Sequence, residues 1–180
     1  YRIIGGIRFY ERAEIKDAVS YLRIVYENQD DVAFERAIMT PKRGIGEKSF
    51  NKIIEVSKNK RISLFQASKL LAGTDEVNKK ASSSLDEFTK VIERGISMIE
   101  STQYPQILKV LLDESGYMDM LKNDKNVSAQ TKIENIKEFS MLSVCVDSRN
   151  GSSAMNFLCN MDPSVLILLS LGCTVLACLA

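Results

Sequence analysis

The chain has 180 residues, of which 45% are hydrophobic and 26% charged, a composition typical of an ordinary globular domain. Its formal net charge is only +1, so any surface that binds nucleic acid has to be local. Histidine is absent, which removes the commonest general base and zinc ligand and excludes Ser-His and Cys-His catalytic pairs.

The N-terminal part of the chain predicts helices after a short extended start. Residues 1–4 form a β-like run that is ended by a pair of glycines. Apolar side chains then recur every three or four residues over 13–26, which predicts an amphipathic helix. Asp30 or Asp31 fits the N-cap of the next helix.

The later elements are also predicted to be helical. A loop at residues 40–46 precedes a third helix, and Ser63 fits the N-cap of a fourth, over residues 64–71, that Gly73 closes. Further helices are expected over about 75–100, 106–114 and 129–139. The sequence therefore predicts a mainly α fold of several helices with short loops.

The last part of the chain has a different composition, because residues 140–180 hold only three charged residues. The cysteines at positions 145, 159, 173 and 178 match no zinc-binding spacing, and we interpret them as unpaired thiols. The uncharged run at 163–180 reaches only the lower end of the length that spans a bilayer, and it lacks flanking basic residues. No membrane partner and no metal site are expected.

One loop stands out as a candidate binding site. Lys42 and Arg43 precede Gly44-Ile45-Gly46, and the next predicted helix follows directly, with Lys48 in its first turn. Glycines at such a place let the backbone approach a ligand closely, with amide groups and the positive end of the helix dipole facing outward. A DNA phosphate suits this geometry, as in helix-hairpin-helix elements that bind duplex without reading bases.

The local charge favours the same interpretation. Residues 36–61 contain eight positive and two negative side chains, in a chain whose net charge is only +1. Local phosphate binding requires such a positive segment. The alternative is structural: Gly44 and Gly46 make a tight turn, and the lysines form a solvated helix face.

Several segments resemble UvrD/PcrA/Rep-type superfamily 1 DNA helicases. Residues 5–17 read GGIRFYERAEIKD, which is similar to the family pattern GG-x-x-F-x-x-R-x-EIKD. The order and spacing of the later segments also match, namely Tyr21-Leu22-Arg23, NQDDVAFER at 28–36, PKRGIG at 41–46, Ser115-Gly116-Tyr117 and IENIKEF at 133–139. The resemblance covers residues 1–139.

The resemblance implies how these residues are organised and which of them bind DNA. Residues 1–20 are expected to be an edge of the second RecA-like domain, 2A, with residues 1–4 as a strand remnant, and residues 21–139 to be the helical 2B domain. Phe9 and Arg12 are expected near single-stranded DNA, where an aromatic ring and a guanidinium suit base stacking and phosphate contact. Alternatively, Phe9 packs in the core and Arg12 pairs with a nearby acid.

The implied duplex contacts lie in the loop and at one helix start. The resemblance implies that the Gly44-Ile45-Gly46 loop binds duplex DNA ahead of the fork. Ser63 occupies a position where the family has a small hydroxyl residue near the duplex backbone, although it also fits a helix N-cap.

The resemblance further implies part of an ATP-dependent 3′→5′ DNA helicase that acts in repair or replication, in the cytoplasm. The chain has no GxxxxGK[ST] loop, so no ATPase activity and no cofactor of its own are expected; ATP and Mg²⁺ belong to the complete family enzyme. The expected partners are duplex/single-strand DNA junctions and the remaining helicase domains.

Because the similarity stops after Phe139, we expect residues 140–180 to be a divergent tail, and a truncated or frame-shifted reading would explain it. Two alternatives remain open: a helical protein–protein module with a hydrophobic docking or membrane tail, and a non-functional remnant of a helicase gene.

Overall fold

The computed structural model describes residues 7–150 of the chain, with side chains from residue 9 to residue 141. Within this range the chain forms helices and no strand, which confirms the mainly α prediction. The expected strand at residues 1–4 lies outside the described residues. The helices are α1 (Ile7–Tyr10), α2 (Ala13–Tyr26), α3 (Asp31–Met39), α4 (Glu47–Lys60), α5 (Leu64–Leu71), α6 (Lys79–Met98), α7 (Tyr104–Glu114), α8 (Tyr117–Asn123) and α9 (Ser128–Asn150).

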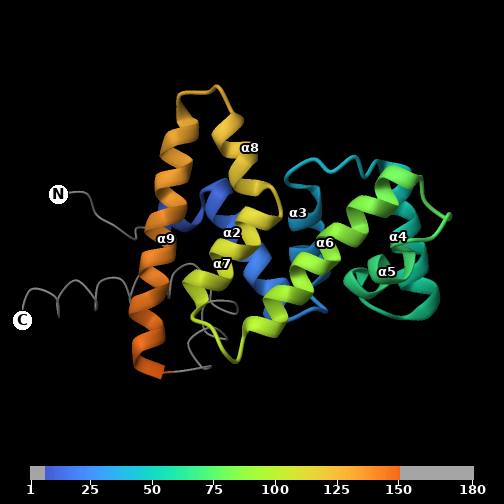
Figure 1. The fold of residues 1–180 in the computed structure, drawn as a ribbon, viewed down its shortest axis with the longest axis horizontal. Helices are drawn as coiled ribbons and strands as arrows, with labels where there is room; N and C mark the ends of the chain where they lie inside the picture. The colour runs from blue at the N-terminus through green and yellow to red at the C-terminus, as the bar shows by residue number, and fades with distance from the viewer. Residues whose placement is uncertain (1–6, 151–180) are drawn as a thin grey trace, which may run out of the picture.

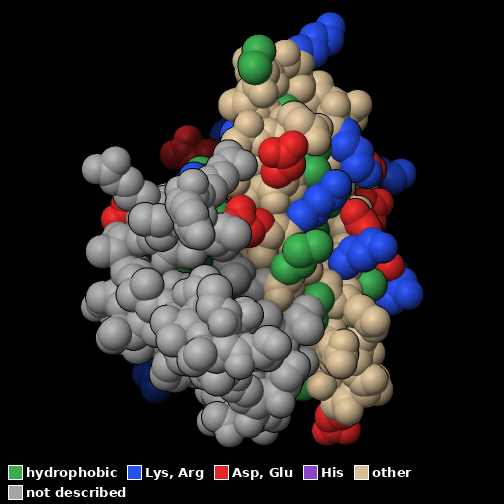
Figure 2. Space-filling model, turned by 90° about the vertical axis from the view of Figure 1, so that its left-hand side faces the viewer, with side chains coloured by type: hydrophobic (Ala, Val, Ile, Leu, Met, Phe, Trp, Pro, Cys, Tyr) green, Lys and Arg blue, Asp and Glu red, His purple; other side chains and the backbone are tan. Residues whose placement is uncertain are grey.

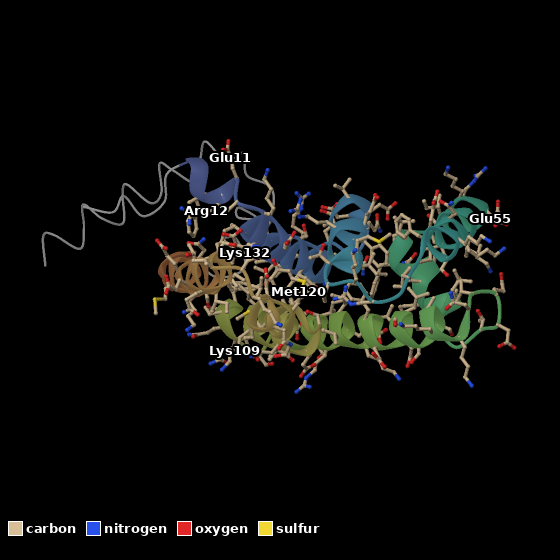
Figure 3. The ribbon with its side chains drawn as sticks, turned by 90° about the horizontal axis from the view of Figure 1, so that it is seen from above. Glu11, Arg12, Glu55, Lys109, Met120 and Lys132 are labelled. Atoms are coloured by element: carbon tan, nitrogen blue, oxygen red, sulfur yellow. The ribbon has the colours of Figure 1, made fainter. Side chains whose placement is uncertain are left out.

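The helices form an elongated arrangement (Figures 1 and 3). Helix α6 runs between a group made by α4 and α5 and a group made by α7, α8 and α9 (Figure 1). Helix α2 lies at the centre, where it packs against α3, α6, α7 and α9. The loop between α3 and α4 runs along the upper edge of the molecule in this view, from its middle to α4, and passes beside the start of α6 (Figure 1).

The core follows the apolar stripes of the sequence. Buried aromatic rings meet edge to face, with the Phe34 and Phe88 centroids 5.8 Å apart and those of Tyr21 and Phe88 6.2 Å apart. Fully buried aliphatic side chains come from α2, α3, α4, α5, α6 and α7, and include Ile15, Ile24, Ile38, Ile53, Leu71, Leu85, Ile92 and Ile107. One continuous core thus joins both groups of helices.

Local capping residues set several helix starts as the sequence predicts. The Asp30 side chain accepts a hydrogen bond from the Ala33 backbone N–H at 2.9 Å, and this confirms an aspartate cap for α3. Asn78 caps α6 in the same way through the Ala81 N–H at 2.7 Å. The expected start of this helix near residue 75 is therefore wrong, because the Asn78 cap begins it at Lys79.

The predicted end of the last helix is also wrong. Helix α9 was expected over 129–139, yet it continues to Asn150. The loss of charge after residue 139 marks a change in composition, and the backbone stays helical across it. The expected boundary between a helical domain and a separate tail at residue 140 thus falls inside a helix.

Candidate nucleic-acid interface

The loop between α3 and α4 presents the start of a helix. Gly46 is the N-cap of α4, with φ −83° and ψ 171°, and no side chain caps this helix end. The first hydrogen bond of the helix runs from the Phe50 N–H to the Gly46 carbonyl at 3.0 Å. The amide groups of the residues between them are the ones that a helix leaves without an intrahelical partner. They are therefore placed to bind an anion.

Gly44 has a backbone conformation that favours glycine. Its φ is +74°, in the left-handed region, where other residues are strained because their Cβ comes too close to the backbone. A Cβ at this position would lie 2.7 Å from Cε and 3.4 Å from Nζ of Lys80, so the Lys80 side chain lies directly over the glycine. Ile45, between the two glycines, is half-buried and packs against the core.

Three lysines surround this loop without neutralising partners. Lys42, Lys48 and Lys80 are exposed, and no ion pair or hydrogen bond joins their amines to the residues that the structure describes. Glu47 is the one acid in the first turn of α4. The loop therefore carries net positive charge, as phosphate binding requires.

Lys80 was missed at the sequence level. It lies 36 positions after Gly44, in the first turn of α6, and only the packing of α6 against the loop brings it to the glycine. The pair Lys79-Lys80 after an asparagine N-cap is a visible signal of a second cationic helix start. Nothing in the spacing connects it to residue 44.

Arg43 does not share the exposure of Lys42. Its Nη1 donates to the carbonyls of Ala37 and Ile38, at 2.8 and 2.9 Å, and its Nη2 donates to the Tyr21 hydroxyl at 2.6 Å. Both terminal nitrogens are thus engaged inside the protein. The expected direct phosphate contact of Arg43 conflicts with this arrangement, because the side chain is used to tie the loop to the core.

Ser63 acts as the N-cap that the sequence predicts. Its hydroxyl accepts a hydrogen bond from the Gln66 N–H at 3.3 Å at the start of α5. Its hydroxyl is thus already used as a helix cap. A contact with the duplex backbone stays a prediction.

Phe9 and Arg12 form a separate region at the junction of α1 and α2. Phe9 is only 5% exposed, so it packs in the core and its ring is not available for base stacking. Arg12, labelled beside α9 in Figure 3, lies over the Phe9 ring at 5.4 Å and donates to the Asn135 side chain. Among the described residues the hydrogen-bond partner of the Arg12 side chain is this amide, which in turn donates to Glu14 at 2.6 Å; pairing of Arg12 with an acid stays a prediction.

A buried polar cluster connects α2 with α3 and α8. The Tyr117 hydroxyl donates to Asp17 Oδ2 at 2.8 Å, while Arg36 Nε donates to Oδ1 of the same carboxylate at 2.6 Å. Burial, followed by the hydrogen bond to Asp17, raises the pKa of Tyr117 above its ordinary value. Burial also raises the pKa of Tyr21, and the nearby Arg43 opposes this effect.

The face that carries α9 differs in its charge from the loop between α3 and α4. Figure 2 shows Lys and Arg side chains interleaved with Asp and Glu on the part of this face that is coloured. Opposite charges at close spacing cancel much of the field that would attract a polyanion. The uncompensated lysines at the loop are therefore the better candidate interface.

Two other kinds of site are absent from the described part of the chain. No group of three or more Asp, Glu or Cys side chains there could hold a metal ion. No helix between residues 7 and 150 is both long and apolar enough to cross a membrane.

The fold and this loop define a helical module with a cation-flanked glycine loop between α3 and α4. A model of the UvrD-like helicase C-terminal domain family matches residues 1–162. The chain belongs to this family.

Curated relatives agree with the family match. The chain is 39% identical over 139 residues to the ATP-dependent DNA helicase PcrA of Bacillus subtilis (strain 168) and 37% identical over 140 residues to DNA helicase II of Escherichia coli (strain K12). Each alignment covers 77% of this chain and 19% of the relative. The chain thus spans about a fifth of the length of the curated relatives it matches.

The similarity continues beyond Phe139. The family match ends at residue 162, and the chain is 35% identical over 169 residues, 90% of its length and 22% of the relative, to an ATP-dependent DNA helicase PcrA of Staphylococcus epidermidis (strain ATCC 12228 / FDA PCI 1200). The expectation that the resemblance stops after Phe139 is therefore wrong.

Proposed function

We propose that this region binds the phosphate backbone of duplex DNA through the Gly44-Ile45-Gly46 loop, as part of an ATP-dependent 3′→5′ DNA helicase. One observation carries the proposal: the glycine-bounded start of α4 is surrounded by Lys42, Lys48 and Lys80, which have no ion-pair partners among the described residues. Membership of a helicase domain family supports the choice of DNA as the anion.

The loop suits a backbone contact rather than base reading. Free amides at a helix start and lysine amines are donors for phosphate oxygens, and neither distinguishes one base pair from another. The described loop has no side chain, such as an exposed Asn or Gln, with the paired donors and acceptors that recognise a base edge. Binding is expected to depend on duplex form and on salt, with little sequence preference.

The proposal places ATP chemistry outside this chain. No GxxxxGK[ST] phosphate loop occurs in the sequence, so the chain offers no cradle for a triphosphate with Mg²⁺. ATP and Mg²⁺ are bound, in this proposal, by the remaining domains of the complete helicase. Those domains are its proposed protein partners, and this chain does not hydrolyse ATP by itself.

A salt titration of duplex affinity tests the proposal. Full-length chain is titrated into a short fluorescent duplex between about 50 and 200 mM salt, and the logarithm of the binding constant is plotted against that of the salt concentration. Lys42→Ala is expected to reduce the slope by about one, because one phosphate contact is lost.

Lys109→Ala provides the matched control. Lys109 is an exposed lysine on α7, away from the loop (Figure 3). This variant has the same change in net charge, yet it is expected to keep the wild-type slope. Equal slopes for the two variants, or duplex binding that does not respond to salt, would contradict the proposal.

A further inference from the structure

Arg43 lies at the C-terminal end of α3, although it belongs to the following loop. Its Nη1 lies 2.8 Å from the Ala37 carbonyl, 2.9 Å from the Ile38 carbonyl and 3.1 Å from the Pro41 carbonyl. The last carbonyls of a helix lack intrahelical partners and carry its negative dipole end. A guanidinium at this place satisfies these acceptors and is itself stabilised by the dipole.

The second terminal nitrogen of Arg43 reaches two other elements. Nη2 donates to the Tyr21 hydroxyl at 2.6 Å and to the Ser115 carbonyl, at the end of α7, at 3.2 Å. The Tyr21 hydroxyl in turn lies 2.8 Å from the Thr40 carbonyl, to which it donates. The guanidinium also lies over the buried Phe88 ring, 4.7 Å from its centroid. One side chain thus joins α2, α3, α6 and α7.

The backbone of the same residue is held by a separate contact. The Ser84 hydroxyl on α6 donates to the Arg43 carbonyl at 2.8 Å. The next residue, Gly44, lies beneath the Lys80 side chain of the same helix. The loop is therefore fixed both by the Arg43 side chain and by the first turns of α6.

We propose that Arg43 is a positioning residue for the loop and not a DNA contact: its planar group fixes the Gly44-Ile45-Gly46 backbone so that amides and lysines meet the phosphates in one arrangement. This inference rests on the proposed duplex binding, which it deepens. Only a guanidinium has the donors in a fixed fork to reach these acceptors together. A lysine side chain at this position keeps the charge, but all its hydrogen-bond donors are on one nitrogen.

Three variants separate positioning from phosphate contact. Arg43→Ala removes both the charge and the fork, Arg43→Lys removes the fork alone, and Tyr21→Phe removes one hydroxyl without any change in charge. Affinity for the duplex is measured over a range of salt concentrations, as for Lys42→Ala. Hydrogen exchange of the full chain, followed by mass spectrometry without DNA, compares the loop with α9.

The positioning role predicts a common pattern for the three variants. Duplex affinity falls by about five- to tenfold in Arg43→Lys and Arg43→Ala, and less in Tyr21→Phe, because binding then has to order a looser loop. The salt slope stays at the wild-type value in all of them, unlike that of Lys42→Ala. Exchange becomes faster in residues 40–48 and remains unchanged in α9, which a general loss of stability would not produce.

A phosphate contact predicts a different pattern. Arg43→Ala would then lower the salt slope by about one, while Arg43→Lys and Tyr21→Phe would bind as the wild type does. That result overturns the inference, and so does loop exchange that stays at the wild-type rate in Arg43→Lys. Since the exchange readout needs no DNA, it tests Arg43 even if the wild-type chain fails to bind duplex, which would contradict only the proposed function.

Discussion

Gly44 and Gly46 are two residues apart and face different backbone requirements. Gly44 has a φ of +74°, while Gly46 has a φ of −83° and nothing within 4 Å of the position that a Cβ would take. Gly44 therefore has a backbone conformation that favours glycine, while the interpretation of the pair as a tight turn stays a prediction. At Gly46 the start of α4 is open, and a side chain there would crowd the phosphate that we propose to bind at this helix start.

Substitution of the two glycines is expected to separate these roles. Gly44→Ala should lower the free energy of unfolding by about 1–2 kcal/mol, because alanine is strained at positive φ. Gly46→Ala should cost only a few tenths of a kcal/mol, as a modest loss at an N-cap. Urea denaturation measures both, and equal costs for the two variants would contradict this assignment.

Cationic residues at the loop show how far sequence reasoning reaches at the residue scale. The sequence predicts two phosphate contacts for the cation pair Lys42-Arg43, yet of these two side chains only that of Lys42 is exposed and without a partner among the described residues. The direction of the Arg43 side chain depends on carbonyls of α3 and α7 and on Phe88, which fold against it from elsewhere in the chain. Charge patterns do not encode such long-range partners.

Helix positions at the element scale could be predicted well from local signals. The caps at Asp30 and Ser63, and the left-handed Gly116 after α7, are all consequences of short-range hydrogen bonding and backbone freedom. The end of α9 could not be predicted in this way, because a fall in charge density is not a helix stop signal. Neither Gly nor Pro occurs between residues 139 and 150 to end the helix.

The crossing of α6 with α2 and α7 depends on a helical glycine. A Cβ at Gly95 would lie 2.8 Å from both Leu111 Cδ2 and Val25 Cγ2, so side chains of α7 and α2 pack directly against α6 at this point. Gly95→Ala should therefore destabilise the protein by about 1–2 kcal/mol, since overpacking outweighs the gain in helix propensity. Urea denaturation measures the change.

Ser97→Ala is the control for that substitution. Ser97 is exposed on the same helix, so alanine there gains propensity without crowding and should change stability by less than about 0.5 kcal/mol. If Gly95→Ala were as well tolerated as Ser97→Ala, the close approach of the three helices would be refuted.

At the scale of the whole molecule, buried tyrosines link stability to alkaline pH. Burial raises the pKa of Tyr10, Tyr21 and Tyr117 in the native state. In the unfolded chain tyrosine loses its proton near pH 10, while the native state keeps it. Stability is thus fully present below about pH 10 and declines as the pH rises beyond it.

Tyr117→Phe tests that coupling. The variant should be less stable at neutral pH by roughly 1–2 kcal/mol, because Asp17 loses a hydrogen-bond donor. Above pH 10 the free energy of unfolding of the variant should fall less steeply with pH than that of the wild type. The difference in slope should correspond to about one proton. Urea midpoints measured from neutral to alkaline pH check this, and parallel curves for both proteins would show that Tyr117 titrates normally in the fold.

The interface itself is a property of the whole fold. The mainly α class and the glycine loop could be predicted from local pattern and resemblance, whereas the meeting of Lys80 with Gly44 required the packing of α6 against the α3–α4 loop. The burial of Phe9 could not be predicted from local pattern either. An aromatic side chain beside an arginine suits either stacking on bases or packing in a core.

The most direct test of duplex binding by this loop is the salt slope of the double variant Lys42→Ala/Lys80→Ala. Two lysines distant in sequence and adjacent to one loop should together lower the slope by about two. The double variant Lys109→Ala/Lys125→Ala, with the same loss of charge on exposed sites of α7 and the α8–α9 turn, should keep the wild-type slope. The same slope in both double variants would contradict the assignment of DNA binding to the Gly44-Ile45-Gly46 loop.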